Sequence, residues 1–100
     1  MEKIRTLTAR KYLIMSCHLF HYFAGHKKYE EALILTLTNK GGSINFLFTN
    51  LNSGETTSLD NPPSGEYVIP LKKGEKTKLL ITASKAIGAY KIAKKRILDP

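Results

Sequence analysis

Residues 64–92, SGEYVIPLKKGEKTKLLITASKAIGAYKI, contain two runs in which side chains suited to a core alternate with more polar ones. The core-facing candidates are Tyr67, Ile69 and Leu71 in the first run, and Thr77, Leu79, Ile81 and Ala83 in the second. A period of two is typical of β-strands, because successive side chains of a strand point to opposite faces. The break at residues 72–75 contains a glycine and predicts a turn, so we expect the two runs to form a β-hairpin.

A second pair of alternating runs precedes this one, ALILTLT at residues 32–38 and SINFLFT at residues 43–49. The same-face apolar positions are Leu33, Leu35 and Leu37 in the first run, and Ile44, Phe46 and Phe48 in the second. The intervening NKGG, residues 39–42, favours a turn because Asn and Gly tolerate positive φ. These residues therefore predict a second hairpin.

Glycine, proline and asparagine residues divide the rest of the chain into short segments. Turns are expected at residues 25–28 and 50–54, a short edge strand at 55–59, and a proline-containing loop at 60–65. After residue 87, Tyr90 and Ile92 fall on one face of a last strand that reaches about Ala93.

The last segment also has a helical alternative. Ser84 would cap a basic helix with Ile87, Tyr90 and Ile97 on one side, but Gly88 would cost it about 1 kcal/mol relative to Ala. We therefore prefer the strand.

Residues 9–24 allow two interpretations. As a helix, the segment would start after Thr8 and stop at Gly25. As a strand, it would need a bend or break near Ser16, since the run is long for one strand. Its aromatic and β-branched content favours the strand.

The length of 100 residues and the hydrophobic content of 42% predict one globular domain. The fold class that we expect is all-β: a small antiparallel β-sandwich of about six or seven strands, with a helical N-terminal segment as the alternative. Residues 1–8 form a lead-in, residues 9–93 the β-sandwich domain, and residues 94–100 a basic tail.

The chain is strongly basic, with sixteen Lys and Arg against eight Asp and Glu and a formal net charge of +8. Such a charge favours anionic partners, among them nucleic acid, lipid or teichoic phosphates and acidic polysaccharide. Lysines on solvent-facing strand positions can also simply prevent sheets from pairing with each other. The candidate anion-binding residues are Lys72, Lys73, Lys76, Lys78, Lys91, Lys94, Lys95 and Arg96.

No arrangement for metal binding or catalysis is predicted, so we expect no enzyme and no cofactor. On a strand, His18 and His21 point to opposite faces, and His26 lies five residues further on. Cys17 is the only cysteine, which excludes an intrachain disulfide, and its neighbour His18 would face away from it. Lys40-Gly41-Gly42-Ser43 lacks the spacing of a phosphate-binding loop.

The run YLIMSCHLFHYFAG, residues 12–25, looks loosely like a signal sequence after the basic residues that precede it. Only about four apolar residues precede Cys17, whereas a signal sequence needs about seven. We expect this run to belong to the fold.

HYFAGHKKYEEALILTLTNKGGSINFLFTN, residues 21–50, and the closing K-x-x-G-x-Y-x-I at residues 85–92 resemble parts of small β-sandwich domains of Gram-positive bacterial envelope proteins and lipoproteins. The resemblance covers roughly residues 18–93. It implies a non-catalytic module at the cell envelope or outside the cell; without it, the cytoplasm is the alternative.

Two functions follow from these observations. The first is a non-enzymatic binding or structural module at an anionic bacterial surface. The second is a small nucleic-acid-binding domain, which would need exposed rings beside the lysines. Its aromatic candidates are Tyr12, Tyr22, Tyr29, Phe46 and Tyr90. A homodimer formed through a sheet edge is a further expectation.

Overall fold

The computed structural model describes residues 4–5, 11–12 and 17–97. Its strands are β1 (Ile4–Arg5), β2 (Lys11–Tyr12), β3 (Cys17–Ala24), β4 (Glu31–Asn50), β5 (Thr56–Asp60), β6 (Gly65–Leu71) and β7 (Lys76–Arg96). The described part of the chain is all-β and contains no helix, as the preferred fold class predicts. The helical alternative for the last segment is therefore wrong. The same holds for residues 17–24, whereas the expected bend near Ser16 lies outside the described residues.

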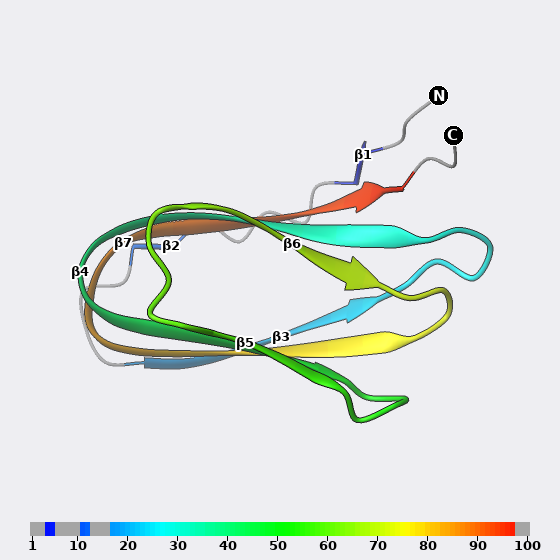
Figure 1. Cartoon of the computed structure of the whole chain (residues 1–100), viewed down its shortest axis with the longest axis horizontal. Helices are drawn as coiled ribbons and strands as arrows, with labels where there is room; N and C mark the ends of the chain where they lie inside the picture. Colours follow the sequence, from blue (N-terminus) through cyan, green and yellow to red (C-terminus); the bar gives the residue numbers. More distant parts are fainter. Residues whose placement is uncertain (1–3, 6–10, 13–16, 98–100) are drawn as a thin grey trace.

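Two long strands organise the molecule. β4 and β7 pair antiparallel along almost their whole length, from Glu31 opposite Arg96 to Asn50 opposite Thr77. Both strands bend sharply at their middles, where the register shifts around Gly41. The sheet therefore curls over on itself (Figure 1).

The bend depends on two glycines that let the strands approach closely. Gly42 has a φ of 72° and Gly88 a φ of 145°, in a region that favours glycine. A Cβ atom on Gly42 would collide with the carbonyl oxygen of Lys85, and one on Gly88 with that of Thr38. These two positions accept no other residue without a shift of the backbone.

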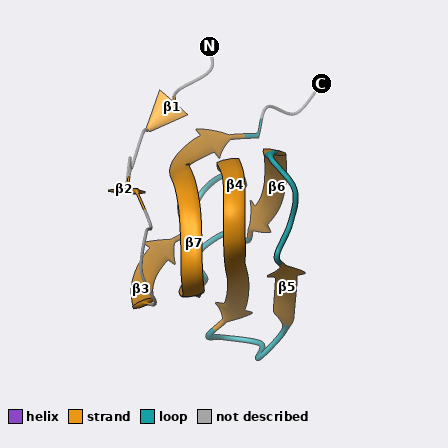
Figure 2. Ribbon diagram, turned by 90° about the vertical axis from the view of Figure 1, so that its left-hand side faces the viewer, coloured by secondary structure: helices purple, strands orange, loops and turns teal. Residues whose placement is uncertain are grey.

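The curl divides the sheet into two halves that face each other (Figure 2). The β3 half contains β3, residues 76–84 of β7, residues 43–50 of β4, and β5, in that order. The β6 half contains β1 and β2 beside residues 87–96 of β7, then residues 31–39 of β4, then β6. Within the described residues, β5 and β6 pair only with β4, so each forms an edge of the sheet.

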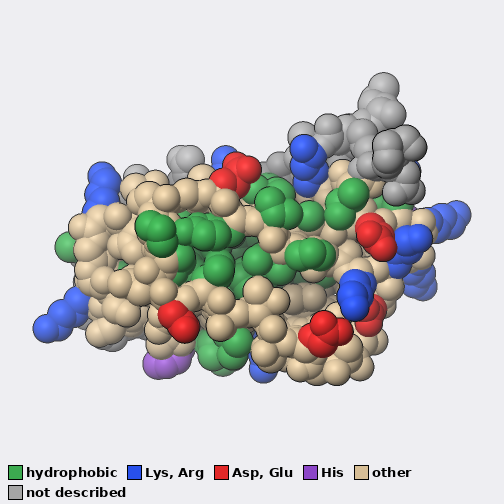
Figure 3. Space-filling model, in the orientation of Figure 1, with side chains coloured by type: hydrophobic (Ala, Val, Ile, Leu, Met, Phe, Trp, Pro, Cys, Tyr) green, Lys and Arg blue, Asp and Glu red, His purple; other side chains and the backbone are tan. Residues whose placement is uncertain are grey.

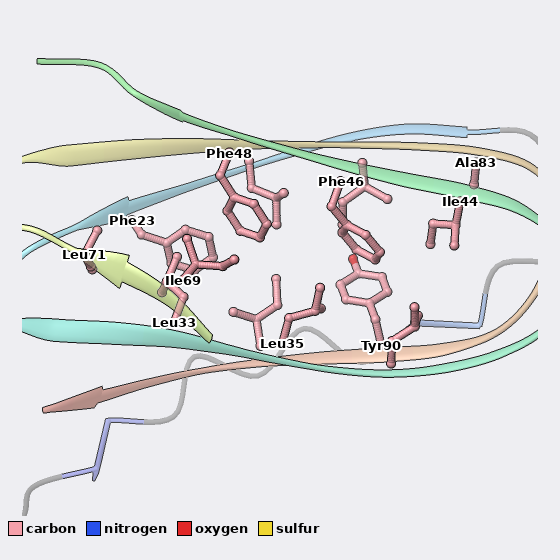
Figure 4. Close-up of a cluster of buried hydrophobic side chains, with 14 of the residues drawn as sticks. Phe23, Leu33, Leu35, Ile44, Phe46, Phe48, Ile69, Leu71, Ala83 and Tyr90 are labelled. Carbon is pink, nitrogen blue, oxygen red and sulfur yellow. The ribbon is translucent and has the colours of Figure 1, made fainter. Parts of the chain in front are cut away.

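The hydrophobic core fills the space between the two halves (Figure 4). The ring of Phe46 from the β3 half meets the ring of Tyr90 from the β6 half edge to face, with centroids 6.2 Å apart. Burial of each large apolar side chain contributes about 1.5–3 kcal/mol.

Most of the predicted inward positions are buried, and Tyr67 is partly buried. The buried members are Leu33, Leu35, Leu37, Ile44, Phe46, Phe48, Ile69, Leu71, Thr77, Leu79, Ile81, Ala83, Tyr90 and Ile92. The period-two pattern therefore identified the core face correctly.

Both predicted hairpins are wrong. Residues 32–38 and 43–49 belong to one strand, β4, and the expected turn between them is its bend. β6 pairs with β4, while β7 pairs with β3 and β4, so residues 72–75 connect the two halves instead of closing a hairpin. Glycine and asparagine permit a bend within a strand as readily as a turn between two strands. Which of the two forms depends on how the two halves of the sheet pack together.

The ends of the expected elements also shift. β7 runs through residues 84–87 without a turn and ends at Arg96, so Lys94, Lys95 and Arg96 belong to the sheet. In the expected lead-in, Ile4 and Arg5 pair with β7. The expected edge strand is β5, one residue later than predicted. The turn expected at residues 50–54 is found at residues 51–55, where it joins β4 to β5.

Candidate anion-binding end

Four segments that are distant in sequence meet at the end of the molecule opposite the two bends (Figure 1). They are the β3–β4 loop at residues 25–30, the β4–β5 turn at 51–55, the β6–β7 turn at 72–75 and the last residues of β7. The amide of Gly25 donates to the carbonyl of Glu75 at 2.7 Å, and that of Gly74 to His26 at 3.0 Å. These bonds fix the β3–β4 loop against the β6–β7 turn.

The other two segments are held in the same way. The amide of Leu51 donates to the carbonyl of Lys76 at 2.8 Å, and the amide of Lys76 donates to Oδ1 of Asn52 at 2.9 Å. The amide of Ile97 donates to the carbonyl of Glu30 at 2.9 Å. We call residues 25–30, 51–55, 72–76 and 94–97 together the basic end.

The basic end gathers most of the predicted anion-binding residues: Lys72, Lys73, Lys76, Lys94, Lys95 and Arg96. It adds Lys27 and Lys28, which the sequence analysis assigned only to a turn. No local pattern could have joined them to Lys72 and Lys73, because the contact between the two loops is tertiary. Figure 3 shows Lys and Arg side chains projecting at this end, with acidic side chains among them.

Two of the predicted cations lie elsewhere. Lys78 is partly buried on the outer face of the β3 half, with its Nζ 5.8 Å from the ring centroid of Phe20. Lys91 is exposed on the outer face of the β6 half. The structure therefore does not bring all eight predicted residues together.

Lys94 serves the fold itself. Its Nζ donates to the carbonyl of Ala24 at 2.9 Å and lies 3.4 Å from the Glu31 carboxylate, whose side chain is only 3% exposed. The same carboxylate accepts the amide of His26 at 2.9 Å. A buried carboxylate needs such partners, so Lys94 is mainly a structural cation that ties β7 to the β3–β4 loop.

Arg96 is also engaged within the protein. Its guanidinium lies 4.3 Å from the ring centroid of Tyr29, and Tyr29 stacks on His26 with centroids 3.8 Å apart. This stack stiffens the β3–β4 loop. Lys27, Lys28, Lys73 and Lys76 are exposed, whereas the Nζ of Lys72 lies 3.5 Å from the exposed Glu55 carboxylate.

A depression of about 400 Å³ opens beside the β3–β4 loop. It is lined by Ala24, Gly25, His26, Lys27, Lys28 and Lys94. Glu31, whose carboxylate accepts the amide of His26, is paired with Lys94 and is not part of the lining. The lining is therefore basic, as a phosphate or carboxylate group requires.

The histidines lie at separate places. His18 is exposed on the outer face of the β3 half. His21 points inward, and its Nε2 lies 3.1 Å from the hydroxyl of Tyr90. The expectation that His18 and His21 occupy opposite faces is thus confirmed. The side chain of Cys17 lies outside what the structure describes, and within its described part no group of His, Cys, Asp and Glu could hold a metal ion.

The aromatic candidates differ in exposure. Phe46 and Tyr90 are buried in the core, and Tyr29 is stacked between His26 and Arg96. Tyr22 is 64% exposed, and the sequence analysis missed Phe20, which is 55% exposed. The side chain of Tyr12 lies outside the described part. Among the candidates whose side chains the structure describes, only Tyr22 therefore presents an open ring.

No protein-family model matches this chain, and no curated protein matches its sequence. The described residues include no helix with the length and hydropathy needed to cross a bilayer.

Proposed function

We propose that the protein is a non-enzymatic binding module, built as a small β-sandwich, whose basic end takes an anionic polymer or surface. The shared chemistry of its ligand is a series of phosphate or carboxylate groups. An envelope surface or lipid headgroups would supply these groups, and so would a nucleic acid.

One observation carries this proposal. Backbone hydrogen bonds between the β3–β4 loop and the β6–β7 turn hold Lys27, Lys28, Lys72 and Lys73 at one end. If the lysines served only to keep sheets apart, they would be spread over edges and solvent-facing strand positions. Grouped cations instead raise the local concentration of a polyanion and release its counterions on binding.

Three carboxylates at or next to this end support the same interpretation because they are engaged within the protein, whereas Glu30 in the β3–β4 loop is exposed. Glu31 is buried against Lys94, and the Oε1 of Glu75 lies 3.4 Å from the Nδ2 of Asn50. Glu55 lies against Lys72. Lys27, Lys28, Lys73 and Lys76 remain exposed for a ligand.

Binding to inorganic polyphosphate and to vesicles of phosphatidylglycerol tests the proposal, with phosphatidylcholine vesicles as the neutral control. We expect binding to the anionic probes and none to the neutral vesicles. Raising the salt from about 50 to about 200 mM should weaken binding about ten-fold or more, since each neutralised phosphate contributes to the salt dependence.

Two double variants separate the basic end from net charge. K27A/K28A removes exposed lysines of the β3–β4 loop, and K40A/K91A removes exposed lysines away from the basic end. Both lose the same formal charge. We expect K27A/K28A to weaken polyphosphate binding about ten-fold and K40A/K91A to weaken it much less. Equal losses, or no binding of any polyanion by the unmodified protein, would contradict the proposal.

A further inference from the structure

The outer face of the β3 half carries aromatic side chains in a row. His18, Phe20 and Tyr22 occupy alternate positions of β3 and are all exposed. Alternate residues of a strand lie about 7 Å apart on the same face. A sheet face with such rings open to water is characteristic of a surface that meets a partner.

The row of rings continues across the sheet as an apolar strip. Phe20 lies opposite Leu80, which lies opposite Leu47, itself 37% exposed. The strip is bordered by lysine, because Lys78 lies opposite Tyr22 and reaches over the ring of Phe20. The face therefore combines planar apolar surface with positive charge.

The same face leads directly into the basic end. Ala24, the last residue of β3, lies opposite Lys76, and the β3–β4 loop with Lys27 and Lys28 follows. Of the described outward positions in the β3 half, only Asp60 carries a carboxylate, and it lies on β5 at the far side of the sheet from β3. A polyanion bound at the basic end can thus continue over the rings without meeting negative charge.

We infer that this face binds single-stranded nucleic acid, with bases stacked on Phe20 and Tyr22 and phosphates held by Lys76, Lys78 and the basic end. The inference rests on the proposed function and names the ligand class. Every base offers a flat face to an aromatic ring, so the binding is tolerant of sequence. A duplex keeps its bases stacked inside and leaves the rings without partners.

The other polyanions use less of this face. Polyphosphate has no group that stacks on a ring. A lipid surface would contact the lysines, but insertion of Phe20 would also bury the hydroxyl group of Thr82, which lies opposite His18 on the neighbouring strand β7. Only a single strand matches both the rings and the charges.

Fluorescence anisotropy with labelled oligothymidine measures the binding. We expect F20A/Y22A to bind at least about five-fold more weakly, because one stacked base is worth that much or more. The variants F20Y and Y22F keep both rings and should bind normally. The matched control V68A/I87A removes exposed apolar side chains from other places, 60% and 50% exposed in the protein, and should also bind normally.

An oligomer of abasic sites keeps the phosphates and removes the bases. We expect the unmodified protein to bind it at least about five-fold more weakly than oligothymidine, and F20A/Y22A to bind the two equally. Duplex DNA should resemble the abasic strand. Circular dichroism of each variant confirms that the fold is retained.

The outcomes separate this inference from the proposed function. If F20A/Y22A binds oligothymidine like the unmodified protein while K27A/K28A does not, the inference is wrong and the basic end still binds polyanions. If F20A/Y22A loses only vesicle binding, the face serves lipid. If it loses only self-association in sedimentation experiments, the face serves a second copy. Either result overturns the inference, and failure to bind any polyanion refutes both proposals.

Discussion

The two ends of this molecule are built on different physical grounds. At the bent end, β4 and β7 approach so closely that Gly42 and Gly88 leave no room for a Cβ atom. At the basic end, loops are joined by hydrogen bonds and by the contact of Lys94 with the buried Glu31 carboxylate. The comparison shows that close packing of the backbone determines the fold at the bent end. At the basic end, hydrogen-bonded loops leave exposed lysines available for a ligand.

The largest effect is expected at the bent end. Replacing Gly88 with Val would drive the new side chain into the carbonyl of Thr38, so we expect G88V to lose more than about 3 kcal/mol of unfolding free energy or fail to fold. Urea denaturation measures the loss. In the control G54A, nothing lies within 4 Å of the new Cβ at a φ of 81°, so the cost should be only about 1–2 kcal/mol. Equal stability of the two variants would show that the bend is not sterically fixed.

The next effect is expected at the basic end. K94A leaves the buried Glu31 carboxylate without its cation, and we expect a loss of about 3 kcal/mol in thermal or urea unfolding. The double variant K94M/E31L removes the uncompensated charge and should recover much of that loss. If K94A is as stable as the unmodified protein, Lys94 is free for a ligand and its structural role is refuted.

A smaller effect is expected from the side chain of Asn39 beside the bend. Its Nδ2 donates to the carbonyl of Pro62 at 2.9 Å, and its Oδ1 accepts the amide of Gly41 at 3.2 Å. We expect N39A to lose about 1–2 kcal/mol, since the Gly41 and Pro62 groups are left without these bonds. N39D keeps the acceptor and loses the donor. Differential scanning calorimetry should therefore give N39D a stability between those of N39A and the unmodified protein. A cost for N39D equal to that of N39A would assign the effect to the donor alone.

The smallest effect is expected at the exposed pair of Lys72 and Glu55. Their side chains are 58% and 72% exposed, so K72A should change the unfolding free energy by less than about 0.5 kcal/mol. In polyphosphate titrations, however, the same variant should weaken binding because it removes a cation of the basic end. If K72A lowers the unfolding free energy but leaves polyphosphate binding unchanged, Lys72 has a structural role and not the ligand-binding role that we assign to it.

The basic end was only partly predictable. Lys72 and Lys73 stand out in the sequence as neighbours, and so do Lys94 and Lys95. They lie beside Lys27 and Lys28 only because the chain crosses between the two halves of the sheet at this end. No local sequence pattern predicts that crossing. Phe20 was missed because alternating aromatics in a strand usually form a core, and only the packed structure shows which face of β3 remains open.

The alternation of residues along the chain determined by itself that the protein is built from strands and which side chains enter the core, because the direction of a strand side chain depends only on its position in the pleat. Tertiary structure decided the rest: that NKGG bends one strand instead of ending it, that β6 pairs with β4, and that lysines distant in sequence share one end. A glycine permits both a bend and a turn, and the choice between them depends on which distant strands bury apolar surface against each other.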